Sequence, residues 1–150
     1  MIEINGIAHI VITVSEWEKC RSFYEELLSF LGLTCVFSGK QGIYYVGGKT
    51  AVGVGPCDAQ YAAQRFAQGG IGLHHVCFRC RSRDDVEKVY SFLNGRQAKI
   101  LRPPEEGPWA PGYFSILFED PCGIRLEVNH VPGRGLLEED ARFEGAGHYQ

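Results

Sequence analysis

The sequence predicts an α+β fold built from two copies of a β-α-β-β-β unit. The first observation behind this prediction is an internal repeat, in which GIAHIVITV, starting at Gly6, returns as GLHHVCFRC, starting at Gly72. The offset is 66 residues (72 − 6), and it also matches His9 with His75. The second observation is that a helix-like segment follows each copy, SEWEKCRSFYEELLSFLG in the first and RSRDDVEKVYSFLNG in the second. A repeat of this size sets the architecture before single elements are assigned.

Each copy opens on an alternating strand, whose successive side chains point to opposite faces. The residues that share one face are Ile7, His9, Val11 and Thr13 in the first copy, and Leu73, His75, Cys77 and Arg79 in the second. Apolar residues then recur at helical spacing. The pairs Ser15/Glu18 and Ser82/Asp85 have the spacing of a capping box, and Gly32 and Gly95 are stop signals.

Three short strands are expected after each helix. They fall at about 33–38, 42–47 and 50–55, and then at about 98–101, 112–119 and 123–130. Asp120 to Gly123 form a tight turn, and a short helix is expected within 58–67. We therefore expect a single domain over residues 1–150, with module 1 at about 5–56, module 2 at about 71–131 and a C-terminal tail at 132–150.

Composition excludes several classes of protein. The net charge is −3 and no Lys/Arg block occurs, which argues against a nucleic-acid partner or an anionic membrane partner. No apolar run reaches the roughly 18 residues that cross a bilayer. The N-terminal segment alternates and lacks the features of a signal peptide, so a cytoplasmic location is expected. In that setting the six cysteines are expected to be reduced.

One set of residues points to metal chemistry. His9 and His75 occupy the same point of the repeat, and the last strand places Glu127 between Arg125 and Asn129 on one face. Imidazole and carboxylate are good ligands for Fe(II), Mn(II), Zn(II), Ni(II) or Co(II), and three ligands leave positions open for substrate. The alternative is two core histidines and a surface glutamate. The matched position of the histidines favours the metal site, with Glu127 as its third ligand.

Other inward residues are candidates for substrate binding. Arg79 and Arg125 are long cations that suit an anionic group, and Tyr113 is an aromatic that suits a pocket wall. The ordinary alternative is an arginine reaching solvent and an aromatic that simply packs. The segment RPPEEGPWAPG has the composition of a rim loop over the site.

Four segments resemble the vicinal oxygen chelate superfamily: AHIVITV, SFYEELLSFLGL, GLHHVCFRC and FEDPCGIRLEV. This superfamily includes glyoxalase I, methylmalonyl-CoA epimerase, fosfomycin- and bleomycin-resistance proteins and extradiol dioxygenases. The resemblance covers about residues 5–130. It implies a glyoxalase-like half-barrel or cup, a homodimer, a small-molecule substrate and one divalent metal ion (Fe, Mn, Ni, Co or Zn) on His9, His75 and Glu127.

The resemblance leaves three functions open. At the fourth metal position glyoxalase I has a glutamate and the epimerase a glutamine, whereas this sequence has Gly53. A lyase or isomerase of the glyoxalase type, acting on vicinal oxygens with Glu127 as ligand and base, is the first. An extradiol-type Fe(II) dioxygenase is the second, although Leu117 stands near the expected tyrosine. A non-catalytic resistance-type protein that sequesters its ligand is the third.

Overall fold

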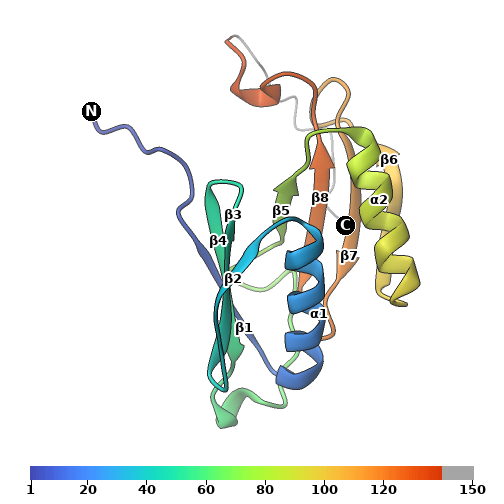
Figure 1. Ribbon diagram of the computed structural model, residues 1–150. Coiled ribbons are helices and arrows are strands. Elements are labelled where there is room, and N and C mark those ends of the chain that lie inside the picture. Colours follow the sequence, from blue (N-terminus) through green and yellow to red (C-terminus); the bar gives the residue numbers. More distant parts are fainter. Residues whose placement is uncertain (140–150) are drawn as a thin grey trace. The chain divides into compact units, whose positions relative to one another are not determined.

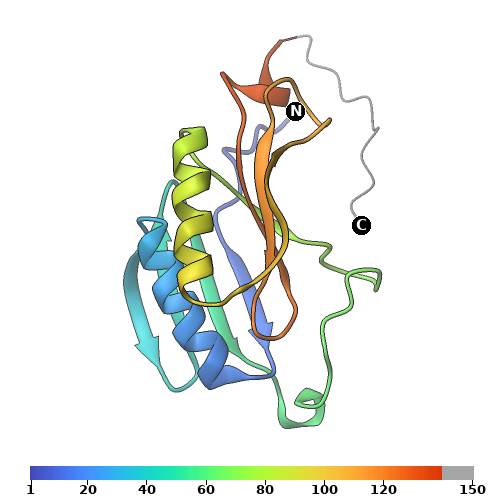
Figure 2. The same ribbon diagram turned by 90° about the vertical axis from the view of Figure 1, so that its right-hand side faces the viewer.

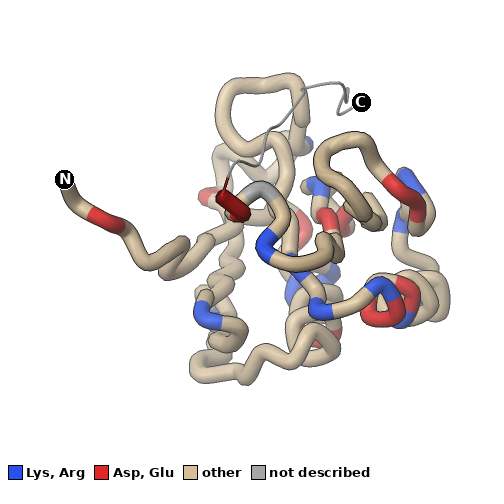
Figure 3. Tube along the Cα trace, turned by 90° about the horizontal axis from the view of Figure 1, so that it is seen from above, with Lys and Arg blue, Asp and Glu red and all other residues tan. Residues whose placement is uncertain are grey.

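A computed structural model describes residues 1–139, so the end of the predicted tail, 140–150, lies outside the described residues. The chain divides into two compact units, Met1–Phe66 and the part from Ala67 onward. Each unit contains one β-α-β-β-β element order, which confirms the predicted α+β class (Figure 1). None of the helices within 1–139 is long and apolar enough to cross a membrane. Acidic and basic residues are interspersed along the described chain (Figure 3).

The first unit is a four-stranded sheet with one helix. Its elements are β1 (Ile10–Val14), α1 (Trp17–Phe30), β2 (Thr34–Gly39), β3 (Gly42–Gly47) and β4 (Thr50–Pro56). The strand order is β1-β4-β3-β2, with β1 parallel to β4 and the other pairs antiparallel. Helix α1 packs on β2, β3 and β4. Only a short turn of 3₁₀ helix, Ala59–Tyr61, forms where a helix was expected within 58–67, so that prediction was too long.

The second unit repeats this topology. Its elements are β5 (Val76–Arg79), α2 (Arg83–Gly95), β6 (Lys99–Glu106), β7 (Phe114–Glu119), β8 (Arg125–His130) and a 3₁₀ turn, Gly135–Leu137. The strand order is β5-β8-β7-β6, with β5 parallel to β8. Strand β6 runs five residues beyond the predicted end at 101, through Pro103 and Pro104. Prolines are tolerated there because β6 is an edge strand.

The two faces of the second sheet differ in character. One face packs against α2 (Figure 2) and is apolar. Its buried residues are Ile116, Phe118, Leu126 and Val128 from the sheet, with Val86, Val89 and Leu93 from the helix. The opposite face carries Ser115, Leu117, Glu127 and Asn129, all buried although three of them are polar. Because buried polar groups need partners, this face is where a functional site is expected.

The helix signals were read partly correctly. Ser82 caps α2, since its side chain accepts a hydrogen bond from the backbone N–H of Asp85 at 3.2 Å. At α1 the cap residue is Glu16, without a side-chain capping bond, so the box predicted at Ser15 is wrong. Gly32 follows α1 with φ +82°, as a stop signal requires. At α2 the left-handed residue is Gln97 (φ +54°), and Gly95 is still helical.

Candidate functional site

Glu127 is the centre of the polar face. It lies on β8, an inner strand flanked by β5 and β7, and its side chain is 0% exposed. A carboxylate removed from water costs several kcal/mol unless other groups compensate for the lost hydration. The groups around Glu127 therefore define the chemistry that this face supports.

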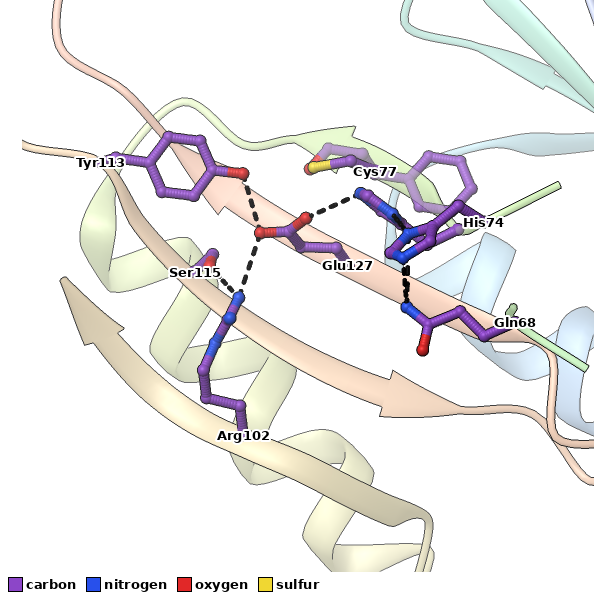
Figure 4. Close-up of polar contacts among 9 residues, drawn as sticks. Gln68, His74, Cys77, Arg102, Tyr113, Ser115 and Glu127 are labelled. Atoms are coloured by element: carbon purple, nitrogen blue, oxygen red, sulfur yellow. Dashed lines mark hydrogen bonds and ion pairs between the residues drawn. The ribbon is translucent and has the colours of Figure 1, made fainter. Parts of the chain in front are cut away.

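The two carboxylate oxygens of Glu127 have different surroundings (Figure 4). Oε1 accepts a hydrogen bond from the Tyr113 hydroxyl at 2.7 Å, and the Arg102 guanidinium lies at 3.4 Å from the same oxygen. Oε2 lies 3.1 Å from Nε2 of His75 and makes no hydrogen bond within residues 1–139. One oxygen is thus held by the protein, while the other is turned toward an imidazole.

Arg102 is a site residue that the sequence analysis missed. Its Nη2 donates to Ser115 Oγ at 3.0 Å as well as to Glu127, and its guanidinium lies 4.8 Å from the centre of the Trp109 ring. Trp109 in turn contacts Tyr113 edge-on, with ring centres 5.0 Å apart. The hydrogen bonds restrain the guanidinium within its plane, and the contact with the aromatic ring restrains it perpendicular to that plane. Trp109 therefore supports both donors to the carboxylate.

A β-bulge explains why alternation could not find Arg102. Ile100 pairs with Phe118, a helix-side residue, whereas Arg102 pairs with Leu117, a residue of the Glu127 face. In a regular strand, residues two apart point to the same face. The register shift between Ile100 and Arg102 breaks that rule and turns Arg102 toward Glu127.

His75 is contacted by its neighbour His74, which strict alternation along the predicted strand would place on the opposite face. The strand predicted to include both histidines begins only at Val76, so alternation does not apply to His74 and His75. The Nδ1 atoms of the two rings lie 2.7 Å apart, and the Gln68 amide lies 2.6 Å from Nε2 of His74. A metal-binding histidine is commonly oriented by a hydrogen bond at its other ring nitrogen. His74 is placed to do this for His75.

The electrostatics keep Glu127 charged and Tyr113 protonated at neutral pH. Burial raises the pKa of Glu127, but its interactions with His75, Tyr113 and Ser115 outweigh the effect of burial, so the pKa lies below its ordinary value. Burial, the Cys77 thiol and the charge of Glu127 all raise the pKa of Tyr113. Tyr113 is therefore a lasting hydrogen-bond donor to an anionic carboxylate.

Cys77 also belongs to this face, since it is the register partner of Glu127 on β5. Desolvation by neighbouring groups, followed by the charge of Glu127, raises the pKa of its thiol, although part of its surface is exposed. At neutral pH Cys77 is therefore a thiol and not a thiolate, which makes it a poor metal ligand. Its place beside His75 in the alternating pattern was the signal that could have marked it.

The two arginines predicted to bind substrate have other neighbours. Arg79 donates to the backbone carbonyls of Val131 and Gly133, at 2.8 and 2.7 Å. Arg125, at the start of β8, faces Glu119 across the β7–β8 pair, with Nε and Oε1 3.9 Å apart. Of the three predicted substrate residues, Tyr113 is the one that the structure joins to Glu127. For all three, substrate binding stays a prediction.

Comparison with known proteins agrees with this architecture. A sequence model of the Glyoxalase/Bleomycin resistance protein/Dioxygenase superfamily matches residues 6–128. The chain belongs to this superfamily. The glyoxalase-like fold that the resemblance implied is thereby confirmed, with the two modules that the repeat predicted.

Solved structures of the superfamily share the fold over most of both chains. A candidate glyoxalase from Bacillus halodurans is 27% identical, with a TM-score of 0.74 over 85% of this chain and 96% of that one. A lactoylglutathione lyase from Agrobacterium tumefaciens is 18% identical (TM-score 0.64; 85% and 95%). The fosfomycin resistance protein FosX from Mesorhizobium loti is 17% identical (TM-score 0.61; 86% and 94%). None of the curated proteins matches the chain.

The donors in the second unit fit the divalent metal ion on which superfamily members commonly depend. Two ligand atoms that each lie about 2.0–2.2 Å from one ion are roughly 3 Å apart when they occupy neighbouring positions. His75 Nε2 and Glu127 Oε2 are 3.1 Å apart, and Oε2 lacks a hydrogen bond within the described residues. The third predicted ligand, His9, lies in the first unit, exposed and just before β1. Its part in the site stays a prediction.

The structure supports the alignment of Gly53 with the fourth ligand position of the superfamily. Gly53 pairs with Val11 on β1 just as Glu127 pairs with Cys77 on β5, and the repeat offset of 66 (77 − 11) relates Val11 to Cys77. A Cβ added to Gly53 would lie 3.0 Å from Cδ2 of Tyr44 and 3.4 Å from Cγ2 of Val11. The Tyr44 ring therefore covers the place from which a fourth ligand side chain would start.

This crowding gives a testable effect on stability. Glycine inside a strand costs roughly 0.5–1 kcal/mol relative to alanine, so Gly53→Ala alone would be stabilising in open space. Because the Tyr44 ring has to give way, we expect Gly53→Ala to destabilise the protein by about 1–2 kcal/mol. In a Tyr44→Ala background the same change is expected to be neutral or stabilising. Urea unfolding of the four proteins measures the coupling, and equal effects of Gly53→Ala in both backgrounds would contradict the account.

Proposed function

We propose that this protein is a metal-dependent lyase or isomerase of the glyoxalase type, acting on a small substrate with two neighbouring oxygens. His9, His75 and Glu127 would hold one divalent ion, Fe, Mn, Ni, Co or Zn. The observation that carries the proposal is the asymmetry of Glu127, whose Oε1 binds Tyr113 while buried Oε2 faces His75 without a hydrogen bond in the described chain. Such an oxygen is suited to a cation.

The residues around Glu127 set what it can do. A bound ion would supply Lewis-acid stabilisation of negative charge developing on a substrate oxygen. Tyr113 and Arg102 fix Oε1, so Oε2 is the oxygen available for ligation or for accepting a proton. The lowered pKa of Glu127 keeps it a carboxylate at neutral pH, as both roles require. His74 and Gln68 hold the His75 ring in orientation.

Metal analysis of the freshly purified protein tests the proposal. We expect about one equivalent of a transition metal, removed by a chelator and restored by one ion of a Ni, Co, Mn, Zn and Fe(II) series. An ion present at 100 times its dissociation constant stabilises the fold by about 2.7 kcal/mol, which a thermal melt detects. Protein that carries no metal and melts unchanged with all five ions would refute the proposal.

A second candidate function, an extradiol-type Fe(II) dioxygenase, is supported by the ligand set of three residues. Two histidines and one carboxylate with open positions are typical of Fe(II) oxygenases, and Gly53 contributes no fourth side chain. This alternative predicts oxygen uptake with a catechol panel that requires Fe(II) and stops with Zn(II). Turnover of a 2-oxoaldehyde hemithioacetal without oxygen uptake would favour the isomerase instead.

The support of Glu127 by Tyr113 gives a further prediction. Tyr113→Phe removes the 2.7 Å hydrogen bond to Oε1 while keeping the ring on Trp109. Loss of a group that orients a metal ligand typically costs about 10–100-fold in metal affinity. We expect a loss in that range, measured by competition with a chromogenic chelator. Tyr90→Phe, on α2 and half-buried, is the matched control and should leave the affinity unchanged.

A further inference from the structure

The second unit contains a cavity of about 190 Å³ beside the Glu127 cluster. Its wall includes Arg79, Tyr113, Asn129, Val131, Arg134 and Leu137. Tyr113 joins the two places, since it lines the cavity and its hydroxyl donates to Glu127. This volume equals roughly six water molecules at liquid density, enough for a small organic molecule.

The charge around the cavity is positive. Arg79 donates to the carbonyls of Val131, Gly133 and Arg134, at 2.8, 2.7 and 3.3 Å, but a carbonyl does not neutralise a guanidinium. Within residues 1–139 no ion pair joins Arg79 or Arg134 to a carboxylate. The nearby Glu138 carboxylate accepts from the backbone N–H of Arg134, at 2.6 Å. Two arginines without a carboxylate partner in this part of the chain thus line one cavity, which favours an anion.

Asn129 supplies a second, independent feature. It lies two residues after Glu127 on the same face of β8, lines the cavity and is only 9% exposed. Its Oδ1 has no hydrogen-bond partner in the described part of the chain. Leaving a buried amide oxygen without a donor costs about 1–3 kcal/mol, so a ligand hydroxyl that reaches it would recover part of that cost.

The rest of the wall limits the size and polarity of the ligand. Ala110, Val131 and Leu137 add apolar residues to the same wall. A ligand that fits has a short apolar body, because the apolar wall offers no hydrogen-bond partners to further polar groups of the ligand. Its anionic end would meet the arginines, and its oxygen-bearing end would point toward Asn129 and Tyr113.

We propose that this cavity is a subsite for a small hydroxycarboxylate, with Arg79 and Arg134 pairing with the carboxylate and Asn129 accepting from the hydroxyl. The proposal rests on the proposed function, in that it names the substrate class of the Glu127 site. It does not need a metal ion for binding, because both cations are arginines of the chain. Arg134 and Asn129 are accordingly specificity-determining residues, and Arg79 also anchors the segment from Val131 to Arg134, which lines the cavity.

Binding to the chelator-treated full-length protein tests this directly. Calorimetry or ligand-observed NMR at low salt would compare lactate with lactamide, which lacks the charge, and with propionate, which lacks the hydroxyl. We expect lactate to bind about threefold to tenfold more tightly than either, since each comparison removes one charged or hydrogen-bonded contact. Inorganic phosphate is included as a competitor, and binding of phosphate in preference to lactate would overturn the carboxylate assignment.

Two variants with controls localise the binding. Arg134→Gln, at an exposed position, should weaken lactate at least threefold, while Arg96→Gln, a guanidinium stacked on Phe92, should not. Asn129→Leu should abolish the preference for lactate over propionate; if it fails to melt cooperatively, the Arg134→Gln pair decides the question. Lactate binding that is absent, equal to that of lactamide, or unaffected by Arg134→Gln would overturn the subsite. Thermal melts of the same wild-type protein with the Ni, Co, Mn, Zn and Fe(II) series test the metal proposal separately, so the two failures are distinguishable.

Discussion

Glu127→Gln is expected to abolish metal binding and any metal-dependent activity while leaving the protein folded. The substitution removes the negative charge that a divalent ion requires but keeps a carbonyl oxygen where Tyr113 can still donate. Substituting a residue that only orients a metal ligand typically lowers metal affinity by about 10–100-fold. Loss of an anionic ligand itself should lower the affinity by more than that. Chelator competition measures the affinity, and far-ultraviolet circular dichroism verifies the fold.

Glu119→Gln is the matched control. Glu119 is a carboxylate on the neighbouring strand β7, where it pairs with Lys99 at 2.8 Å and faces Arg125. It is not a predicted ligand, so the control variant should bind metal as the wild type does. The site assignment would be wrong if Glu127→Gln retained metal affinity within about threefold of wild type, a difference below 1 kcal/mol.

Phe118→Ala is expected to cause the largest loss of stability. Phe118 is 0% exposed, lies on the helix side of β7 and pairs in register with Leu126, which is also 0% exposed. Truncating a fully buried phenylalanine typically costs about 3–5 kcal/mol through lost transfer free energy and the remaining cavity. Urea unfolding at constant slope measures the loss of free energy of unfolding.

Phe37→Ala is the corresponding control, because Phe37 on β2 is 55% exposed. The same atoms are removed, but most of them already contact solvent, so we expect a loss below about 1 kcal/mol. Similar losses of unfolding free energy for the two variants would contradict the prediction that the burial of Phe118 makes it the more important of the two for stability.

The repeat made much of the fold predictable. The matched histidine and the helix that follows it are visible in a short stretch of each half of the sequence. Two copies of one sequence unit indicate that the same topology forms twice. The order of elements and the turn at Asp120 followed from this pattern; in the structure Asp120 Oδ1 accepts from the N–H groups of Cys122 and Ile124, both at 2.8 Å. The family resemblance also assigned Gly53 to the fourth ligand position, and the parallel pairing of β1 with β4, like that of β5 with β8, supports this alignment.

Strand ends and strand faces were less predictable. Alternation assigned faces to the residues around His75 as if the strand began at Leu73, but hydrogen bonding to β8 starts only at Val76. The residues before Val76 are outside the strand, so their side chains need not alternate, and His74 lies against His75. The rim loop was likewise expected to start at Arg102, where the chain instead continues as β6.

The sequence by itself determined the class of the fold, the repeat and the candidacy of His9, His75 and Glu127, because these depend on spacing along the chain. Only the tertiary structure decided what surrounds Glu127. Tyr113 and Arg102 are 14 and 25 residues away from it in sequence, and they reach it through the register of three strands and a bulge in β6. Register and bulges arise from packing between strands, which no local pattern encodes. For that reason the carboxylate was predictable, whereas the partners that leave Oε2 facing His75 were not.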